Sequence, residues 1–354
     1  MEEKFNNHQV IPNAKNSLSK PRNFIIDDLR GLGIFVMIMI HTNVYFLSNK
    51  IAYTTLELSQ FAVPLFVFCS SYLSFQKELV FTPKTFFEYV KKRFFRLLPP
   101  YYIFLAIYLI FTHLKEPKKI TEQYVINNIL MIGGLDFNWL VFLFLEFTFL
   151  TPFLYILRKK RHLLFMIFFI TSMFSAVIFL RYTPLPNYRY FMWLPWSLVI
   201  IFALFFKELE KNKKFILGSI IISGLLFFLS RTYQDLTAHS LFQYNNKYPP
   251  NVYHLSYGIF ATLILYKISE YNLLLPFRKL FAYLSKFSYS IYFIHILVIY
   301  VVTVFMKIKF NWVSFFVSVL LISLTVQWIL NWVFTFFQHY KEGRRSEYLP
   351  EHGG

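Results

Sequence analysis

The chain has few charged residues, little glycine and almost no cysteine for its length. Asp, Glu, Lys and Arg make up 15% of 354 residues, against about 25% in an average soluble domain. Only ten residues are glycine, and the single cysteine, Cys69, excludes an intrachain disulfide. So low a charge content is not that of an ordinary soluble enzyme.

The chain is instead rich in apolar and aromatic residues. Hydrophobic residues make up 56% of the chain and aromatic residues 22%, and the mean hydropathy is positive. These values are typical of a polytopic membrane protein. The net charge of +18 is compatible with nucleic-acid binding. The basic residues, however, lie in short clusters between apolar runs, so we expect the lipid bilayer as a partner and no nucleic acid.

The apolar runs predict an all-α integral membrane protein with about ten transmembrane helices. A helix that crosses the hydrocarbon core needs about 20 apolar residues. The predicted spans are 25–47, 54–75, 97–114, 138–157, 163–180, 190–206, 215–231, 252–269, 285–306 and 312–337. They form one transmembrane domain, 24–338, between an N-terminal tail, 1–23, that we expect to be mobile and a C-terminal tail, 339–354.

The loops between the predicted spans predict the orientation of the chain. Lys and Arg are enriched in the even-numbered gaps, whereas the odd-numbered gaps hold one to three basic residues each. Cytoplasmic loops carry the excess of basic residues. Ten spans with both termini in the cytoplasm satisfy both the span count and the charge distribution.

The first span begins with charged residues and ends on a histidine, in the stretch "DDLRGLGIFVMIMIH". Arg30 and His41 are separated by about three helical turns, so they share a face about 16 Å apart along the axis, and Asp27 lies within about 40° of them. Ionisable groups inside a membrane usually face a protein interior or a wet cavity. The alternative interpretation is a local Asp27–Arg30 pair near the interface, with His41 simply hydrogen-bonded.

Further polar residues lie inside the predicted spans. Glu146 falls near mid-depth of the fourth span, where a carboxylate is a functional candidate or the partner of an arginine or tyrosine. Ser288, Tyr292 and His295 recur at helical spacing in the ninth span and predict one polar stripe. That stripe is compatible with a substrate site or with interhelical hydrogen bonds alone.

The stretch "KKRFFRLLPPYY" precedes the third predicted span and contains Lys92, Arg93 and Arg96. The two arginines are one turn apart and can act on one anion. We expect either a clamp for the phosphates of a cytosolic metabolite such as CoA or simple anchoring by basic residues. We expect no metal ion.

Four stretches in order, and a fifth in the fourth predicted span, resemble the membrane acyltransferase 3 family, whose members O-acylate sugars and cell-envelope polymers. The first span resembles the Arg-x10-His signature of that family, and the matching residues are Asp27, Leu29, Arg30, Gly31 and His41. "PLFVFCSSYLSF" resembles its Phe-rich Ser-Gly segment, with Ser71 where Gly is usual. "RFFRLLPPYY" and "SYSIYFIH" match two later elements, and "NWLVFLFLEF", with Trp139, resembles the fourth helix.

The resemblance implies a multi-pass enzyme of the cell (plasma) membrane. Acyl-CoA, and acetyl-CoA in particular, would bind at the basic inner face. The acceptor would be a hydroxyl of a carbohydrate or glycolipid at the outer face. His41 would act as the base, since a neutral imidazole suits that role. Arg30 would bind CoA or hold Asp27 in place. Direct transfer and a covalent acyl intermediate are both compatible with the sequence.

A second class of function is compatible with the same residues. Glu146, His41 and His295 within helices are also typical of a proton-coupled exporter of a glycan or small solute. Binding of acyl-CoA distinguishes the two, because only the enzyme requires it. A third interpretation, an assembly factor, predicts that His41 can be replaced without effect.

Overall fold

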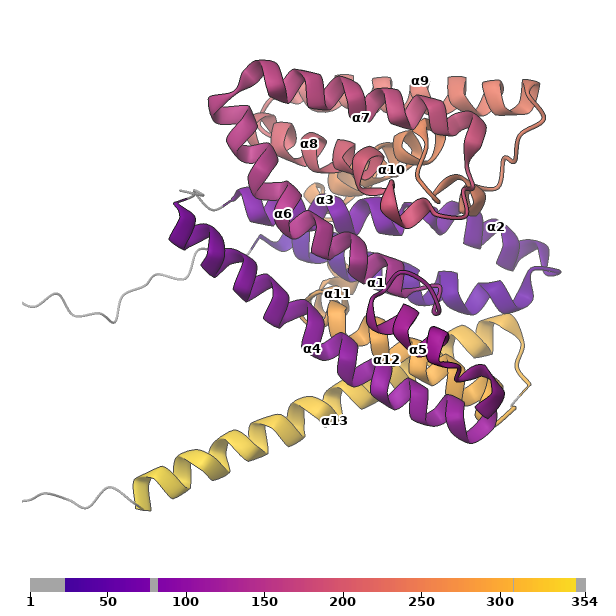
Figure 1. Ribbon diagram of the computed structural model, residues 1–354, viewed down its shortest axis with the longest axis vertical. Helices are drawn as coiled ribbons and strands as arrows, with labels where there is room; N and C mark the ends of the chain where they lie inside the picture. The colour runs from indigo at the N-terminus through magenta and orange to yellow at the C-terminus, as the bar shows by residue number, and fades with distance from the viewer. Residues whose placement is uncertain (1–22, 77–81, 308, 348–354) are drawn as a thin grey trace, which may run out of the picture.

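A computed structural model describes residues 23–76, 82–307 and 309–347 (Figure 1). Within these ranges the fold is all-α, as predicted, and the only β-type pairing is an isolated bridge between Lys247 and Pro250. The α-helices are α1 Phe24–Asn43, α2 Lys50–Leu58, α3 Ala62–Phe75, α4 Pro83–Lys115, α5 Glu122–Ile129, α6 Asn138–Lys160, α7 His162–Tyr182, α8 Trp193–Leu209, α9 Lys213–Leu236, α10 Val252–Glu270, α11 Arg278–Lys286, α12 Ser288–Tyr300 and α13 Trp312–Glu347.

Seven helical segments in the described ranges are long and apolar enough to cross a membrane, or eight if the bent α10–α11 pair is one span. Each of the ten predicted spans overlaps a helix. Two of those helices depart from the ordinary pattern of a span: α8 has only 17 residues, and α1 carries Asp27, Asp28 and Arg30 near its start. The count of ten and the cytoplasmic termini therefore stay predictions.

Helix boundaries differ from the predicted ones at two places. α4 is one helix of 33 residues that continues through Pro99 and Pro100, so the basic cluster lies inside it rather than before it. The prolines cannot donate to the carbonyls of the preceding turn, and Tyr289 of α12 donates to the neighbouring carbonyl of Leu97 (2.7 Å). α13 continues to Glu347, into the predicted tail. The rest of that tail and residues 1–22 lie outside the described residues.

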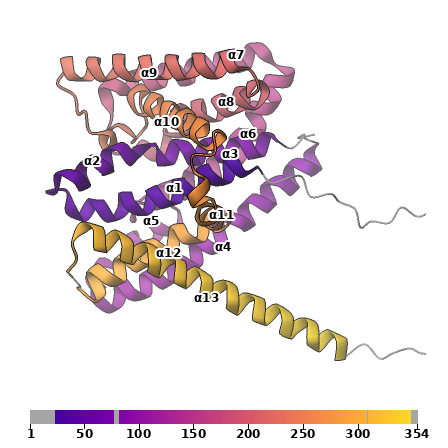
Figure 2. The same cartoon turned by 180° about the vertical axis from the view of Figure 1, so that it is seen from behind.

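α1 lies in the middle of the molecule. It contacts α3 and α10 on one side and α11, α12 and α13 on the other. Both views show α1 between the α2–α3 segment and α12, with α7 and α9 forming an outer layer and the end of α13 projecting from the bundle (Figures 1 and 2). Most of the α1 side chains are buried, so this helix supplies the scaffold for its own polar residues.

α1 and α11 approach each other closely at Gly31. A Cβ atom added there would lie 2.2 Å from the carbonyl oxygen of Phe281 in α11, far inside van der Waals contact. Backbone therefore packs directly on backbone, and no side chain larger than hydrogen fits without moving a helix. The glycine that follows Arg30 thereby determines how α1 seats on α11.

Contacts along α1 distinguish two ends of the bundle. At its start, Ser269 near the end of α10 donates to Asp28 (2.9 Å), and Arg278 forms an ion pair with the same carboxylate (3.4 Å). α10 consequently runs antiparallel to α1, and the loop before α10 lies beside the end of α1 that carries His41. We call the two ends the Arg30 end and the His41 end.

Replacement of Gly31 by Ala should lower the free energy of unfolding by about 1–3 kcal/mol, because overpacked positions cost that much and the clash is with backbone. Unfolding of the purified protein in detergent measures it. Gly218 in α9 has open space around its Cβ position, so Gly218→Ala is the matched control and should be neutral or stabilising. Equal stability of the two variants would contradict the backbone contact.

Candidate active site

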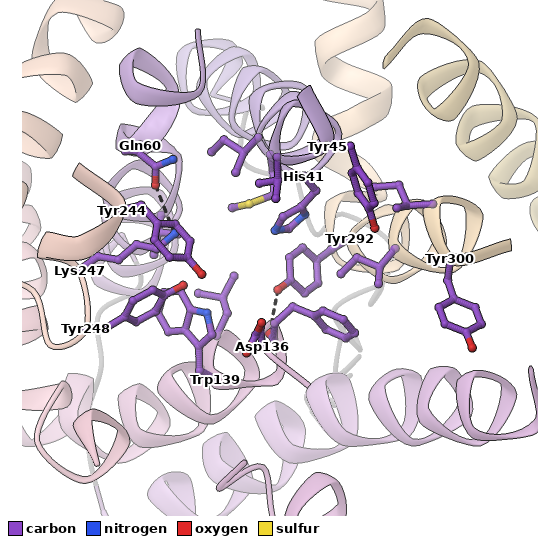
Figure 3. A pocket seen from close by; sticks show the side chains of 18 of the residues that line it. His41, Tyr45, Gln60, Asp136, Trp139, Tyr244, Lys247, Tyr248, Tyr292 and Tyr300 are labelled. Atoms are coloured by element: carbon purple, nitrogen blue, oxygen red, sulfur yellow. Dashed lines mark hydrogen bonds between the residues drawn. The ribbon is translucent and has the colours of Figure 1, made fainter. Parts of the chain in front are cut away.

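One cavity of about 260 Å³ lies at the His41 end (Figure 3). Its walls include parts of α1, α6, α12 and the loop before α10. Most of the lining side chains are aromatic or aliphatic. The polar and aromatic side chains that line it are His41, Tyr45, Gln60, Tyr108, Asp136, Trp139, Tyr244, Lys247, Tyr248, Tyr292 and Tyr300. Of the residues proposed from sequence, the cavity includes His41, Trp139 and Tyr292.

His41 is hydrogen-bonded to a second histidine. Its Nδ1 lies 2.7 Å from Nε2 of His295 in α12, and the two rings are nearly parallel. Nδ1 of His295 lies 2.9 Å from the carbonyl oxygen of Ile291. A carbonyl only accepts, so His295 Nδ1 carries hydrogen and its Nε2 accepts from His41 Nδ1–H. Nε2 of His41 is then left with a lone pair, as a base requires.

The polar stripe of α12 contacts three different parts of the chain. Ser288 accepts a hydrogen bond from Arg30 Nη2 (3.1 Å). Tyr292 donates to the carbonyl of Phe137 in the loop before α6 (2.9 Å) and lines the cavity. His295 holds His41. The three residues that share a helical face therefore connect the Arg30 end of α1 to the cavity.

Asp27 and Arg30 lie away from the cavity. Asp27 accepts a hydrogen bond from Ser285 of α11 (2.7 Å), and Arg30 donates to Ser288 at the start of α12. The cavity lining includes neither residue. Their contacts hold the start of α1 against α11 and α12, whereas His41 lies near the other end of α1.

Basic side chains of α4 gather near Arg30. Arg96 lies within electrostatic range of both Arg30 and Arg93. The Arg93 guanidinium is 5.7 Å from the ring centre of Tyr89, and its Nε has no hydrogen-bond partner among the described residues. Lys92 is exposed on the same helix. In the described part of the chain, neither Arg93 nor Arg96 forms an ion pair with a carboxylate. Close arginines without counter-ions are suited to an anion.

Glu146 and Trp139 of α6 occupy different surroundings. Oε2 of Glu146 is buried without a hydrogen-bond partner in the described structure, and the residue does not line the cavity. The Trp139 ring stands nearly perpendicular to that of Tyr248, with ring centres 5.3 Å apart, and stacks on Trp196 at 6.4 Å. Trp139 thus forms part of an aromatic wall of the cavity.

Lys247 is a cavity residue that sequence reasoning missed. Its side chain is only 6% exposed. Nζ donates to Oε1 of Gln60 (3.2 Å) and lies 4.3 Å and 5.0 Å from the ring centres of Tyr244 and Tyr248. Burial lowers the pKa of Lys247 to about 7, although the nearby carboxylates oppose that shift. In the sequence it is one lysine in a polar loop, "YNNKYPP", and nothing local marks it as buried.

A network of amide side chains fixes the loop that carries Lys247. Asn246 donates to the carbonyls of Ser240 (2.8 Å) and Phe242 (2.9 Å) and accepts from Gln234 (2.5 Å) and Asn251 (2.6 Å). Every polar group of this asparagine side chain is therefore used, which holds the loop in one conformation. Lys247 follows directly and is positioned by it.

Two other loops complete this side of the cavity. The amide of Leu185 donates to the carbonyl of Tyr248 (2.8 Å), which joins the loop after α7 to the Lys247 loop. Buried Arg189 donates to the carbonyl of Met131 (2.5 Å) and to the Asn138 side chain. That contact holds the segment before α6, which supplies Asp136 and Phe137. The Lys247 loop and the segment before α6 thus form a roof over the cavity at the His41 end, and the loop after α7 supports both.

The cavity combines the His41 imidazole with aromatic and hydrogen-bonding side chains. His41 and Lys247 lie within electrostatic range of each other on its walls. Aromatic faces beside a few hydrogen-bonding side chains are suited to a sugar ring and its hydroxyls. The described residues contain no group of three His, Cys, Asp or Glu side chains that could hold a metal ion.

Comparison with known proteins places the chain in a family. A family model described as an acyltransferase domain matches residues 23–332, which include α1 to α12 and most of α13. Searches of curated proteins and of solved structures find no significant match. The matched region includes the Arg30 end, the histidine pair and the roof loops. Because the model matches most of the chain, the chain belongs to the acyltransferase 3 family and is a membrane acyltransferase.

Proposed function

We propose that this protein is a membrane O-acyltransferase that moves an acyl group, acetyl in particular, from cytosolic acyl-CoA to a hydroxyl of an extracytoplasmic glycan or glycolipid. The observation that carries the proposal is the hydrogen-bonded chain from the Ile291 carbonyl through His295 to His41 at a cavity wall. This chain of hydrogen bonds leaves Nε2 of His41 with a lone pair, which is what an acyltransferase needs in a base. Its product would be an O-acetylated polysaccharide or lipid-linked sugar.

The proposed reaction uses His41 for one proton. Nε2 takes the proton of the acceptor hydroxyl while its oxygen attacks the thioester carbonyl. The carbon–sulfur bond then breaks, and the proton on His41 passes to the CoA thiolate. During the step the His41 imidazolium keeps its Nδ1–H hydrogen bond to His295, which orients the ring and stabilises the charge. His295 is accordingly a positioning residue.

The arginine cluster at the opposite end of α1 supports a donor site there. Arg30, Arg93 and Arg96 come from two helices, and Arg96 lies within electrostatic range of the other two. We assign them to the phosphates of CoA, with Lys92 at the rim. The thioester on the long pantetheine arm would then extend toward His41. The charge distribution of the loops supports a cytoplasmic position for this end, and we assign the protein to the plasma membrane.

Acyl transfer is favoured over proton-coupled export. The family assignment describes an acyltransferase, and the base-and-cavity arrangement gives that chemistry a place to occur. Glu146, which an exporter would need on its ion path, does not line the cavity.

Replacing His41 by Gln should lower the rate of acetyl transfer by about 10²–10⁴, because Gln can hydrogen-bond but cannot take the proton. Mass spectrometry of envelope glycans and release of CoA thiol by the purified protein measure the loss. Acetyl-CoA binding should persist, which shows that the variant is folded. Exposed His113 at the end of α4 provides the control His113→Gln.

His295 should behave as a positioning residue. His295→Gln retains an acceptor for His41 Nδ1–H, so it should keep much more activity than His295→Ala at similar stability. An active His41→Gln protein would remove His41 from the chemistry. Equal activities of the two His295 variants would remove the positioning role.

Replacing Arg93 and Arg96 together by Gln should weaken acetyl-CoA binding by about tenfold or more, the usual worth of hydrogen bonds to charged groups. Calorimetry on the detergent-solubilised protein measures it. Lys159→Gln with Lys160→Gln at the end of α6 removes the same charge from another basic cluster and should leave the affinity unchanged. If the arginine variant binds acetyl-CoA as tightly as the unmodified protein, the cluster is a membrane anchor and not a donor site.

A further inference from the structure

We propose that Lys247 determines the specificity of the acceptor site by binding the carboxylate of an acidic sugar. The inference rests on the proposed function and deepens it, because it names the class of acceptor. It depends on three observations: a buried amine with no carboxylate at ion-pair distance in the described structure, although Glu57 and Asp136 act on it from farther away, its place at the His41 end, and the walls around it.

The first observation is the incomplete coordination of the amine. Nζ of Lys247 has one hydrogen-bond acceptor, the neutral Oε1 of Gln60, whose amide nitrogen is itself held by the Leu56 carbonyl. Within the described ranges, no carboxylate lies at ion-pair distance from Lys247. A buried ammonium group is costly without a counter-ion. An anionic ligand in the cavity would supply one.

The second observation is location. Lys247 belongs to the roof at the His41 end, whereas Arg30 and the arginines of α4 lie at the other end. The donor phosphates already have a cationic partner there. The anion that meets Lys247 therefore belongs to the acceptor.

The third observation is the shape and charge of the walls. Tyr244 and Tyr248 flank the amine, and Trp139 packs against Tyr248 on the same wall (Figure 3). Such aromatic faces pack against sugar rings. A volume of about 260 Å³ is small for a ligand pocket and suits one sugar unit. Asp136 on the same lining is partly in solvent and can accept hydrogen bonds from sugar hydroxyls.

A single negative charge fits these walls better than a double one. The cavity holds one lysine and one carboxylate, Lys247 and Asp136. These two charges cancel, so a monoanionic carboxylate that pairs with Lys247 leaves one excess negative charge in the cavity. A phosphate dianion would leave two, at a larger electrostatic cost in a site of low dielectric constant.

Binding of matched sugars to the full-length protein in nanodiscs tests the proposal without any donor. Glucuronate should bind at least tenfold more tightly than glucose or the neutral glucuronamide, because a charge-assisted hydrogen bond is gained. Lys247→Gln should remove that preference and leave glucose binding unchanged. Lys247→Arg should keep part of it. Exposed Lys50 at the start of α2 gives the control Lys50→Gln, which should retain the full preference.

Several results would overturn the assignment. Equal affinities for glucuronate and glucuronamide in the unmodified protein would do so without reference to any variant. So would a preference that survives in Lys247→Gln, tighter binding of glucose 6-phosphate than of glucuronate, or no binding of any of these sugars. Failure of acetyl transfer in the unmodified protein would refute the proposed function alone, since the sugar-binding measurement involves neither acetyl-CoA nor His41 as a base.

Discussion

The contact of backbone against backbone at Gly31 sets the position of α1, and the remaining site geometry depends on it. With α1 seated on α11 at Phe281, Asp27 meets Ser285, Arg30 meets Ser288 and, further along, His41 meets His295. A change in the seating of α1 would displace all three contacts together. A small residue at the crossing of two helices allows this kind of approach in membrane proteins, where packing rather than hydrophobic exclusion holds helices together.

In the proposed reaction, the histidine pair would hold a base in a membrane interior without a permanent charge. A triad of the serine-hydrolase type orients its imidazole with a buried carboxylate. Here the orienting group is a second neutral imidazole, itself oriented by the Ile291 carbonyl of its own helix. Because no ionised carboxylate has to be buried beside His41, the desolvation cost of that arrangement is avoided. The pairing leaves Nε2 of His41 for the cavity.

The separation of charge along α1 gives the molecule two distinct ends. Arginines from α1 and α4 gather at one end, and a cavity with aromatic walls and a single lysine lies at the other. The proposed reaction, between a polyanionic donor and a sugar acceptor, would use this separation, since each ligand would meet its own electrostatic environment. The roof loops, fixed by the Asn246 and Arg189 hydrogen bonds, form the side that we propose for the acceptor.

The sequence by itself determined the helical class, the approximate positions of the spans, the shared face of Arg30 and His41, and the family resemblance. All of these follow from local composition and helical periodicity, which act over short separations. Tertiary structure alone decided that His41 bonds His295, 254 positions away in the chain, and that Lys247 is buried against Gln60, 187 positions away. It also decided that α4 continues through two prolines and that the Tyr289 hydroxyl joins it to α12 at Leu97. Such contacts depend on which helices become neighbours, and helix packing sets that through the sum of many long-range contacts that no single stretch of sequence specifies.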